Sequence, residues 1–473
     1  MGSWLARSRN IQYLLKRNIC FFDKTHSLLH ANSSYKTLPP YETPHGFCAS
    51  VLSFRRSEST MAGKQAQADD DDGNQSIEFP GGRVGFTTEM DFISEVTDKR
   101  VPCYRLLDDD GFLISGTTFE QPDRETAARM YESMLSLQIM DTIFYEAQRQ
   151  GRLSFYLTST GEEAINIATA AALSPDDIIL PQYREPGILL WRGFSMEEFA
   201  SQCFGTKDGR GKGRQMPVHY GSNSHNFFTV SSPIATQLPQ AAGVAYSLKM
   251  DGKEACAVAF TGDGGTSEGD FHAGMNFAAV MEAPVLFICR NNGWAISTPI
   301  SQQFRSSINS DGVVVKGQAY GIRSIRVDGN DALAVYSAIR AAREMVVREQ
   351  KPVLVEALTY RVGHHSTSDD STKYRSVSEI EQWRSTGNPM TRFRNWVLAN
   401  GWWTDEHETE LRGTIRKQVL KAIQVAEKTH KPPLEDLFSD VYDKTPSNLQ
   451  EQEKSLRETI NKYKQDFPAD VPL

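Results

Sequence analysis

The feature that most constrains the fold is an alternation of short apolar segments with segments rich in small residues, which extends from about residue 160 to residue 360. The apolar segments occupy residues 178–180, 255–260, 285–289, 324–327 and 353–358. Segments with helical composition separate them, at residues 161–173, 235–245 and 271–281. Repeated strand–helix–strand alternation predicts an α/β fold with a doubly wound parallel sheet.

The flanks of this region have a different character. Residues 79–125 read as an irregular N-terminal arm, with a strand-like piece at 104–107 and a turn at 108–111. An apolar helical stripe follows, interrupted by Asp141. We therefore expect an α/β domain over residues 126–400. Charged amphipathic helices are expected over residues 401–473.

The N-terminal segment is basic although the whole chain has a net charge of −8. Residues 1–57 hold eight Lys or Arg and two acids, and residues 9–17 can form a basic amphipathic helix. This composition predicts an organellar transit peptide over residues 1–60, and an ordinary disordered basic tail is the alternative. Residues 61–78 contain four consecutive aspartates and almost no large apolar side chains, so we expect a disordered acidic linker there.

Composition excludes several classes of protein. The net negative charge gives no sign of a nucleic-acid partner. The longest apolar runs, such as residues 283–289, are far shorter than the ~20 residues that cross a bilayer, which excludes membrane insertion. Six scattered cysteines without a C-x-x-C pair make a zinc cage or a secreted disulfide framework improbable.

The chemistry is expected where the segment at 255–260 ends. Gly262, Asp263 and Gly264 follow it, and after 26 more residues Asn291 and Asn292 follow the next apolar segment. Ligands of open parallel sheets bind beyond the carboxyl ends of the strands. Asp263 and Asn292 would lie at neighbouring strand tips, where carboxylate and amide oxygens suit Mg²⁺ bound to a phosphate ligand.

The glycine-rich turn allows two other interpretations. A nicotinamide-type turn requires G-x-G-x-x-G, but Ser267 stands where the third glycine should be. A purely structural glycine turn would not explain the Asn-Asn pair at this distance on the next strand.

The Gly-Asp-Gly and Asn-Asn pattern resembles the motif of thiamine diphosphate-dependent enzymes. Segments 182–185, 211–220, 231–237 and 360–370 narrow the resemblance to alpha subunits of the decarboxylase component of branched-chain 2-oxo acid dehydrogenases. The likeness extends from about residue 80 to the end of the chain. Two positions depart from the family pattern, because Asp263 replaces a glutamate and Trp294 replaces a tyrosine.

The resemblance implies a role for each matching residue. Mg²⁺ would be held by Asp263, Asn292 and the carbonyl oxygen of Trp294. Thiamine diphosphate would be held by Tyr183, Arg184, Ser232, Asp263, Gly264, Gly265, Arg290 and His365. K⁺ would be held by Ser231, Pro233, Thr236 and Gln237, a stretch that otherwise reads as a helix cap.

The same resemblance implies catalysis and regulation in one polar loop. His365 would be the catalytic residue, as a proton donor or oxyanion stabiliser for which a pKa near neutrality is suitable. His364 is expected to make a structural hydrogen bond. Ser366 and Ser376 would be phosphorylated by a regulatory kinase and dephosphorylated by a phosphatase. The composition of residues 364–376 predicts a loop that is not packed into a core.

The implied activity is oxidative decarboxylation of branched-chain 2-oxo acids with acylation of the lipoyl group on an acyltransferase. The implied assembly contains two alpha and two beta chains in the mitochondrial matrix, with the beta subunit completing the site. Two alternatives stay open at this point. The chain could act on pyruvate, although its His-His-Ser loop favours a branched-chain substrate, or it could be a non-catalytic cofactor-binding partner. Solvated or ion-paired roles for His365, Arg184 and Arg290 are the simpler alternatives.

Overall fold

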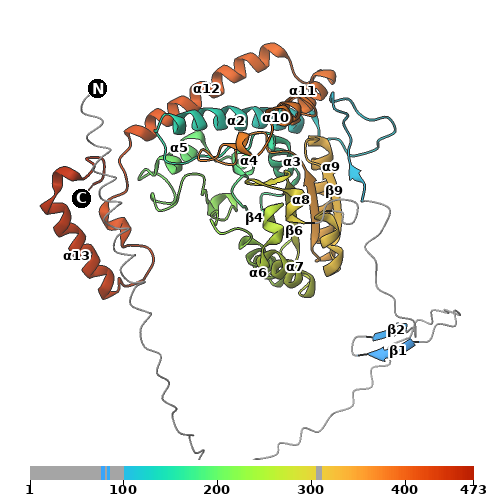
Figure 1. Ribbon diagram of the computed structural model, residues 1–473, viewed down its shortest axis with the longest axis horizontal. Coiled ribbons are helices and arrows are strands. Elements are labelled where there is room, and N and C mark those ends of the chain that lie inside the picture. Colours follow the sequence, from blue (N-terminus) through green and yellow to red (C-terminus); the bar gives the residue numbers. More distant parts are fainter. Residues whose placement is uncertain (1–75, 80–81, 86–100, 305–311, 473) are drawn as a thin grey trace, which may run out of the picture. The chain divides into compact units, whose positions relative to one another are not determined.

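The computed structural model describes residues 76–79, 82–85, 101–304 and 312–472, which belong to two units, Met1–Met90 and Asp91–Leu473 (Figure 1). In the first unit, β1 (Ser76–Phe79) and β2 (Gly82–Gly85) pair as an antiparallel hairpin. The expected transit peptide and nearly all of the expected acidic linker lie outside the described residues.

The second unit is built on a six-stranded sheet in the order β3-β9-β10-β6-β5-β4, in which every neighbouring pair is parallel. The strands are β3 (Cys103–Tyr104), β4 (Ile178–Leu180), β5 (Ala257–Gly262), β6 (Val285–Asn291), β9 (Arg323–Asp328) and β10 (Val353–Leu358). The sequence therefore predicts the fold class correctly, and the arm expected at 79–125 contributes the edge strand β3.

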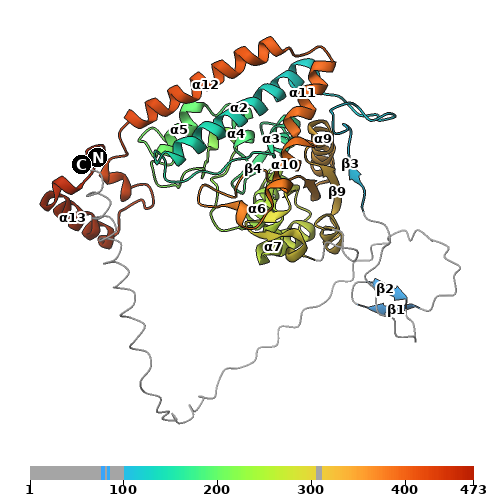
Figure 2. The same cartoon turned by 45° about the horizontal axis from the view of Figure 1, so that its top comes forward.

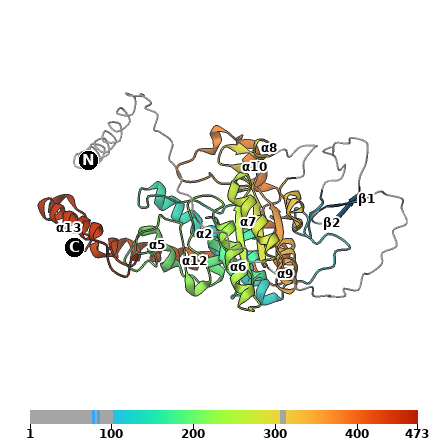
Figure 3. The same ribbon diagram turned by 90° about the horizontal axis from the view of Figure 1, so that it is seen from below.

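Helices cover both faces of the sheet, as a doubly wound fold requires. On one face, α6 (Gln237–Met250) and α7 (Gly269–Val280) pack side by side (Figure 3). A side chain on Gly274 would place its Cβ 2.8 Å from the backbone of Leu238, so this glycine permits the close packing. On the other face lie α3 (Glu163–Ala172) and α9 (Ala332–Glu349).

An outer helical layer covers α3 and α9. The long helix α2 (Arg124–Arg149) runs beside α12 (Asp405–Lys428) and contacts α11 (Pro389–Ala399) (Figure 2). The acid in the apolar stripe of α2, Asp141, is also buried. It accepts hydrogen bonds from the Tyr156 hydroxyl and the Ser159 backbone N–H.

The second unit also contains further α-helices and two short strands. They are α4 (Pro186–Trp191), α5 (Met196–Phe204), β7 (Trp294–Ala295), β8 (Thr298–Pro299), α8 (Ile300–Gln303), α10 (Val377–Ser385) and α13 (Ser447–Lys462). Within the described ranges, no helix is both long and apolar enough to span a bilayer.

The polar loop at 364–376 corrects one expectation. Ser366, Thr367 and Ser371 in this loop are buried, at 8%, 6% and 1% exposure. The Thr367 backbone N–H donates to the Tyr156 carbonyl oxygen, and the Thr367 hydroxyl accepts from the Tyr156 N–H. Composition failed here because hydroxyl groups can be buried when each finds a hydrogen-bond partner.

Candidate active site

A cavity of about 490 Å³ lies at the carboxyl ends of β4, β5 and β6. It brings together residues that are far apart in the sequence. All ten residues expected to hold thiamine diphosphate or Mg²⁺ line it: Tyr183, Arg184, Ser232, Asp263, Gly264, Gly265, Arg290, Asn292, Trp294 and His365.

The register of the sheet explains why the two motifs meet. Gly262, the last residue of β5, pairs with Arg290 near the end of β6. Asp263 therefore follows one strand at the level where Asn292 follows its neighbour. Both side chains are buried, at 2% and 5% exposure.

Asp263 carries a buried carboxylate. Its Oδ2 accepts a hydrogen bond from Nε2 of Gln303, 2.5 Å away. Burial raises the pKa of the Asp263 carboxyl group above its ordinary value, although the bond from Gln303 opposes this effect. A cation in the cavity would favour the ionised form.

The amide of Asn292 is oriented by two contacts. Its Nδ2 donates to Oε1 of Glu162 at 2.8 Å, and its Oδ1 accepts from the Trp294 N–H at 3.3 Å. The carbonyl oxygen of Trp294 accepts from Nη1 of Arg361 at 3.0 Å, so a metal ion would use its second lone pair. Across the described ranges, no three His, Cys, Asp or Glu side chains converge into a metal site.

Arg290 is held by two buried carboxylates. Its Nε donates to Oε1 of Glu185 and its Nη1 to Oε2 of Glu162. Burial alone would lower the pKa of this guanidinium group, but the charges of Glu185 and Glu162 outweigh it and raise the pKa. The third nitrogen, Nη2, is buried and has no hydrogen-bond partner in the described part of the chain. An anionic ligand in the cavity is one partner that would satisfy this buried N–H group.

The glycines of the β5–α7 turn allow the backbone to come close to its surroundings. A Cβ on Gly264 would lie 2.6 Å from the Cβ of Ala295, and one on Gly265 would lie 2.2 Å from Oγ1 of Thr261. Both distances are shorter than real Cβ atoms tolerate. Glycine is therefore required at both positions, because protein atoms already fill the space that a side chain would take.

Arg184 connects two loops at the cavity. It is 1% exposed, and its Nη1 and Nη2 donate to the carbonyl oxygens of Thr158 and His365, each at 2.6 Å. The hydroxyl of Tyr183 lies 3.4 Å from Nε2 of His365. Arg184 and Arg290 are thus buried parts of the site rather than surface ion pairs.

His365 departs from the expected near-neutral pKa. Burial lowers the pKa of its imidazole to about 3, and the positive charges of Arg184 and Arg361 add to this effect. Its backbone N–H donates to Oδ2 of Asp369 at 2.8 Å, which fixes the loop. The neighbouring His364 makes the structural contact expected of it, because its Nδ1 accepts from the Ser371 backbone N–H at 3.1 Å.

The residues expected to bind K⁺ form a group of oxygens next to the cavity. The Thr236 hydroxyl lies 3.0 Å from the Ser231 hydroxyl and 3.2 Å from the Pro233 carbonyl oxygen. Gln237 uses its Nε2 to donate to the Phe260 carbonyl oxygen at 2.6 Å.

Five residues of the site have no function predicted from the sequence. They are Glu162, Glu185, His219, Gln303 and Arg361. Glu162 could have been suspected, because two adjacent glutamates open an otherwise apolar helical segment. The cavity also has an apolar wall, which the sequence did not reveal: Phe155, Leu157, Met216, Ile234 and Ile296.

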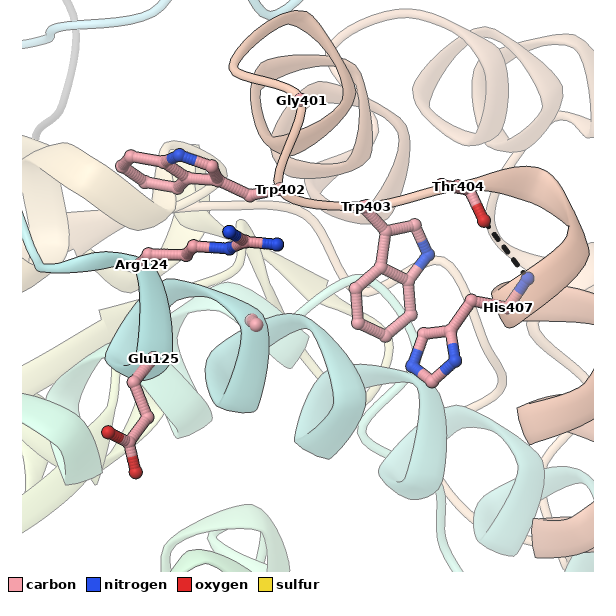
Figure 4. Close-up of a pocket in the computed structure, with 8 residues that line it drawn as sticks. Arg124, Glu125, Gly401, Trp402, Trp403, Thr404 and His407 are labelled. Atoms are coloured by element: carbon pink, nitrogen blue, oxygen red, sulfur yellow. Dashed lines mark hydrogen bonds between the residues drawn. The ribbon is translucent and has the colours of Figure 1, made fainter.

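A second cavity, of about 510 Å³, lies between the start of α2 and the α11–α12 connection (Figure 4). Its lining includes Arg124, Trp402, Trp403 and His407. None of the expected site residues line it, and it is not at a strand end. The first cavity is therefore the candidate active site.

Comparison with known proteins agrees with this geometry. Residues 131–435 match the family model described as dehydrogenase E1 component. This match covers more than half of the chain. The chain therefore belongs to the dehydrogenase E1 component family.

Similar curated proteins carry more specific names. The chain is 62% identical, over 99% of both sequences, to 2-oxoisovalerate dehydrogenase subunit alpha 1, mitochondrial, of Arabidopsis thaliana. It is 46% identical to 2-oxoisovalerate dehydrogenase subunit alpha, mitochondrial, of Homo sapiens, over 83% of this chain and 87% of the human one. The relative from Caenorhabditis elegans with the same name is also 46% identical, over 88% and 95%. A subunit named alpha implies a beta subunit in the complexes of these relatives.

Proposed function

We propose that this chain is the alpha subunit of a branched-chain 2-oxo acid dehydrogenase of the mitochondrial matrix. It takes part in the oxidative decarboxylation of acids such as 3-methyl-2-oxobutanoate, in branched-chain amino acid catabolism. The acyl group passes to the lipoyl group of a partner acyltransferase. The names of relatives that match the chain over most of its length support this function.

The observation that carries the proposal is that all ten residues expected to hold thiamine diphosphate and Mg²⁺ line one cavity. Among them is Arg290, whose Nη2 has no partner among the described residues. Its position beside a glycine turn and two oxygen-bearing strand tips fits a diphosphate with a divalent cation. When bound, thiamine diphosphate supplies the carbanion and the electron sink that decarboxylation requires. The chain itself contributes binding, orientation and charge.

The metal and diphosphate roles follow from the donor set. Asp263, Asn292 and the Trp294 carbonyl offer only oxygen atoms, which Mg²⁺ prefers. The arginine and tyrosine side chains and the two glycines would contact the diphosphate, together with His365, and Ser232 would contact thiamine diphosphate or its substrate. The oxygens of Ser231, Pro233, Thr236 and Gln237 would hold K⁺ and stabilise the turn that carries Ser232.

His365 is the residue proposed to move a proton at Nε2. Its imidazole is neutral in the ligand-free site, so it must first accept a proton before it can act as the expected proton donor. Arg184 and Arg361 are the charges that keep its pKa low, and an anionic ligand beside them would oppose their effect. His365 therefore gains basicity when the site is filled.

The remaining partners are proposals as well. A beta subunit would complete the site in a heterotetramer of two alpha and two beta chains. A regulatory kinase and a phosphatase would act on Ser366 and Ser376.

The proposed division of the chain has five segments. They are the transit peptide at 1–60, the linker at 61–78, the arm at 79–125, the cofactor domain at 126–400 and the C-terminal helices at 401–473.

The test is co-expression with a beta subunit, followed by assay of the complex on the three branched-chain 2-oxo acids and on pyruvate. We expect turnover of the branched acids and much slower turnover of pyruvate. Faster turnover of pyruvate would assign the chain to the pyruvate enzyme. Cofactor binding without turnover of any of the four acids would indicate a non-catalytic partner.

A further inference from the structure

The cavity wall carries a hydrogen-bonded pair that the proposed function does not explain. Nε2 of His219 lies 2.7 Å from Oγ of Ser232, and both residues line the cavity. His219 precedes the short turn Asn223–His225, and Ser232 precedes α6. The apolar residues Met216 and Ile234, which are close to the pair in the sequence, also line the cavity.

The direction of the hydrogen bond follows from the other ring nitrogen. Nδ1 of His219 lies 3.1 Å from the carbonyl oxygen of Pro217. A carbonyl oxygen only accepts, so Nδ1 carries a proton, and in this tautomer Nε2 is an acceptor. The Ser232 hydroxyl therefore donates its proton to Nε2. What Ser232 presents to the cavity is its oxygen lone pairs.

Backbone strain marks the same two segments. Val218, next to His219, has φ 65°, and Ala235, three residues after Ser232, has φ 68°. Both are buried. A β-branched residue in the left-handed region is a rare conformation, and such strain persists where packing holds a functional group in place.

We propose that His219 is a positioning residue that fixes the hydroxyl group of Ser232 as a hydrogen-bond acceptor for the bound ligand. The ligand group at this point is accordingly an N–H or O–H donor of the cofactor or the substrate, not an anionic diphosphate oxygen. This inference rests on the proposed function. It states which partner donates the hydrogen bond at Ser232, and the resemblance does not provide this.

The test uses the complex with the beta subunit. Four variants are compared: His219→Phe, His219→Gln, Ser232→Ala and the double variant that combines His219→Phe with Ser232→Ala. Thiamine diphosphate affinity is measured by calorimetric titration, and KM and kcat are measured for 3-methyl-2-oxobutanoate. His219→Phe should weaken one binding constant about three- to tenfold, the effect of one hydrogen bond, and change kcat little. A weaker cofactor affinity places the donor on the cofactor, and a higher KM alone places it on the substrate.

Two further results identify a positioning role. His219→Gln can place an amide oxygen near the position of Nε2, so it should restore the binding constant to within about twofold. In the double variant, the loss should equal that of Ser232→Ala alone, since His219 acts through Ser232. Additive losses, or a His219→Gln variant as weak as His219→Phe, would overturn the inference.

His272 provides the matched control, because its Nδ1 lies 2.6 Å from the Tyr320 hydroxyl and neither residue lines the active-site cavity. His272→Phe should leave both binding constants unchanged. If the wild-type complex fails to bind thiamine diphosphate, the proposed function is wrong. If the wild type binds and turns over, and His219→Phe changes neither the thiamine diphosphate affinity nor KM, only the present inference is wrong.

Discussion

Arg290 and Glu162 form a buried ion pair, at 1% and 0% exposure, that leaves Nη2 of the arginine without a partner among the described residues. Glu162 also orients Asn292 through its second oxygen. Burial alone would raise the pKa of Glu162, but the nearby positive charges, Arg290 first, lower it, so the carboxylate is ionised. One side chain thus links the expected diphosphate ligand to the expected metal ligand.

The first prediction concerns this link. Glu162→Gln should lower the free energy of unfolding by about 3 kcal/mol, because it removes one partner of a buried ion pair while Glu185 retains the other. Thiamine diphosphate affinity should fall as well, since Arg290 and Asn292 lose their common anchor. Denaturant unfolding and calorimetric titration of the complex measure the two effects.

Glu163→Gln is the matched control for this prediction. Glu163 is equally buried, but burial raises its pKa to about 8, so it is mostly neutral at pH 7. The control should be as stable as the wild type, or more stable. Equal destabilisation by both variants would show that the charge of Glu162 is not the cause of the lower free energy of unfolding.

The second prediction concerns the metal site. Asp263→Asn should weaken Mg²⁺-dependent binding of thiamine diphosphate at least about tenfold, roughly 1.4 kcal/mol, because a neutral amide does not balance the charge of the ion. Asp251→Asn, at an exposed carboxylate after α6, should have no effect. Unchanged cofactor affinity of Asp263→Asn at saturating Mg²⁺ would remove Asp263 from the metal site.

The sequence predicts the sheet and the strand-tip location of the site because both depend on local patterns. The apolar segment expected at 285–289 becomes β6, and the segment expected at 178–180 becomes β4 without change. Asp263 and Asn292 could be placed together because the carboxyl ends of parallel strands share one edge.

The sequence does not predict contacts that depend on packing between distant segments. Glu162 and Arg290 are 128 residues apart, and only their burial makes the pair strong. The same holds for His365, whose low pKa results from burial and from two arginines on other segments. Polar composition likewise failed to predict a buried loop at Ser366, because hydrogen-bond partners decide whether hydroxyl groups can be buried.

The third prediction concerns pH. Burial raises the pKa of Asp141 to about 7 and that of Glu163 to about 8, whereas such groups titrate near ~4 in an unfolded chain. The folded protein therefore keeps protons that the unfolded chain releases, and the stabilisation present below about pH 4 is lost as the pH rises toward 8. We expect the melting temperature to fall between about pH 5.5 and 8, and to fall less in Glu163→Gln. The exposed Glu406→Gln should follow the wild-type profile in calorimetry.

The fourth prediction concerns targeting. Deletion of residues 1–60 should leave folding and activity intact, since none of the proposed site residues lie there. A full-length fluorescent fusion should enter mitochondria, and the deletion fusion should stay in the cytosol. Import of the deletion fusion into mitochondria would show that the targeting signal lies elsewhere in the chain.

The last prediction concerns regulation of the loop next to His365. Ser366 is 8% exposed and adjoins the proposed catalytic histidine, so a phosphoryl group there adds about 1.5–2 negative charges and bulk to a packed position. Ser376 is exposed and caps α10, where its hydroxyl accepts from the Glu379 N–H. Negative charge at a helix N-terminus is favourable, so modification there is tolerated.

We therefore expect Ser366→Glu to abolish most 2-oxo acid oxidation and Ser376→Glu to retain nearly wild-type activity. Thiamine diphosphate should protect the loop from protease in the wild type and in Ser376→Glu, but not in Ser366→Glu. The reason is that charge and bulk at Ser366 break the hydrogen bonds between Thr367 and Tyr156, which anchor the loop. Wild-type turnover and protection in Ser366→Glu would refute the regulatory role of this loop and leave the metal-site assignment intact.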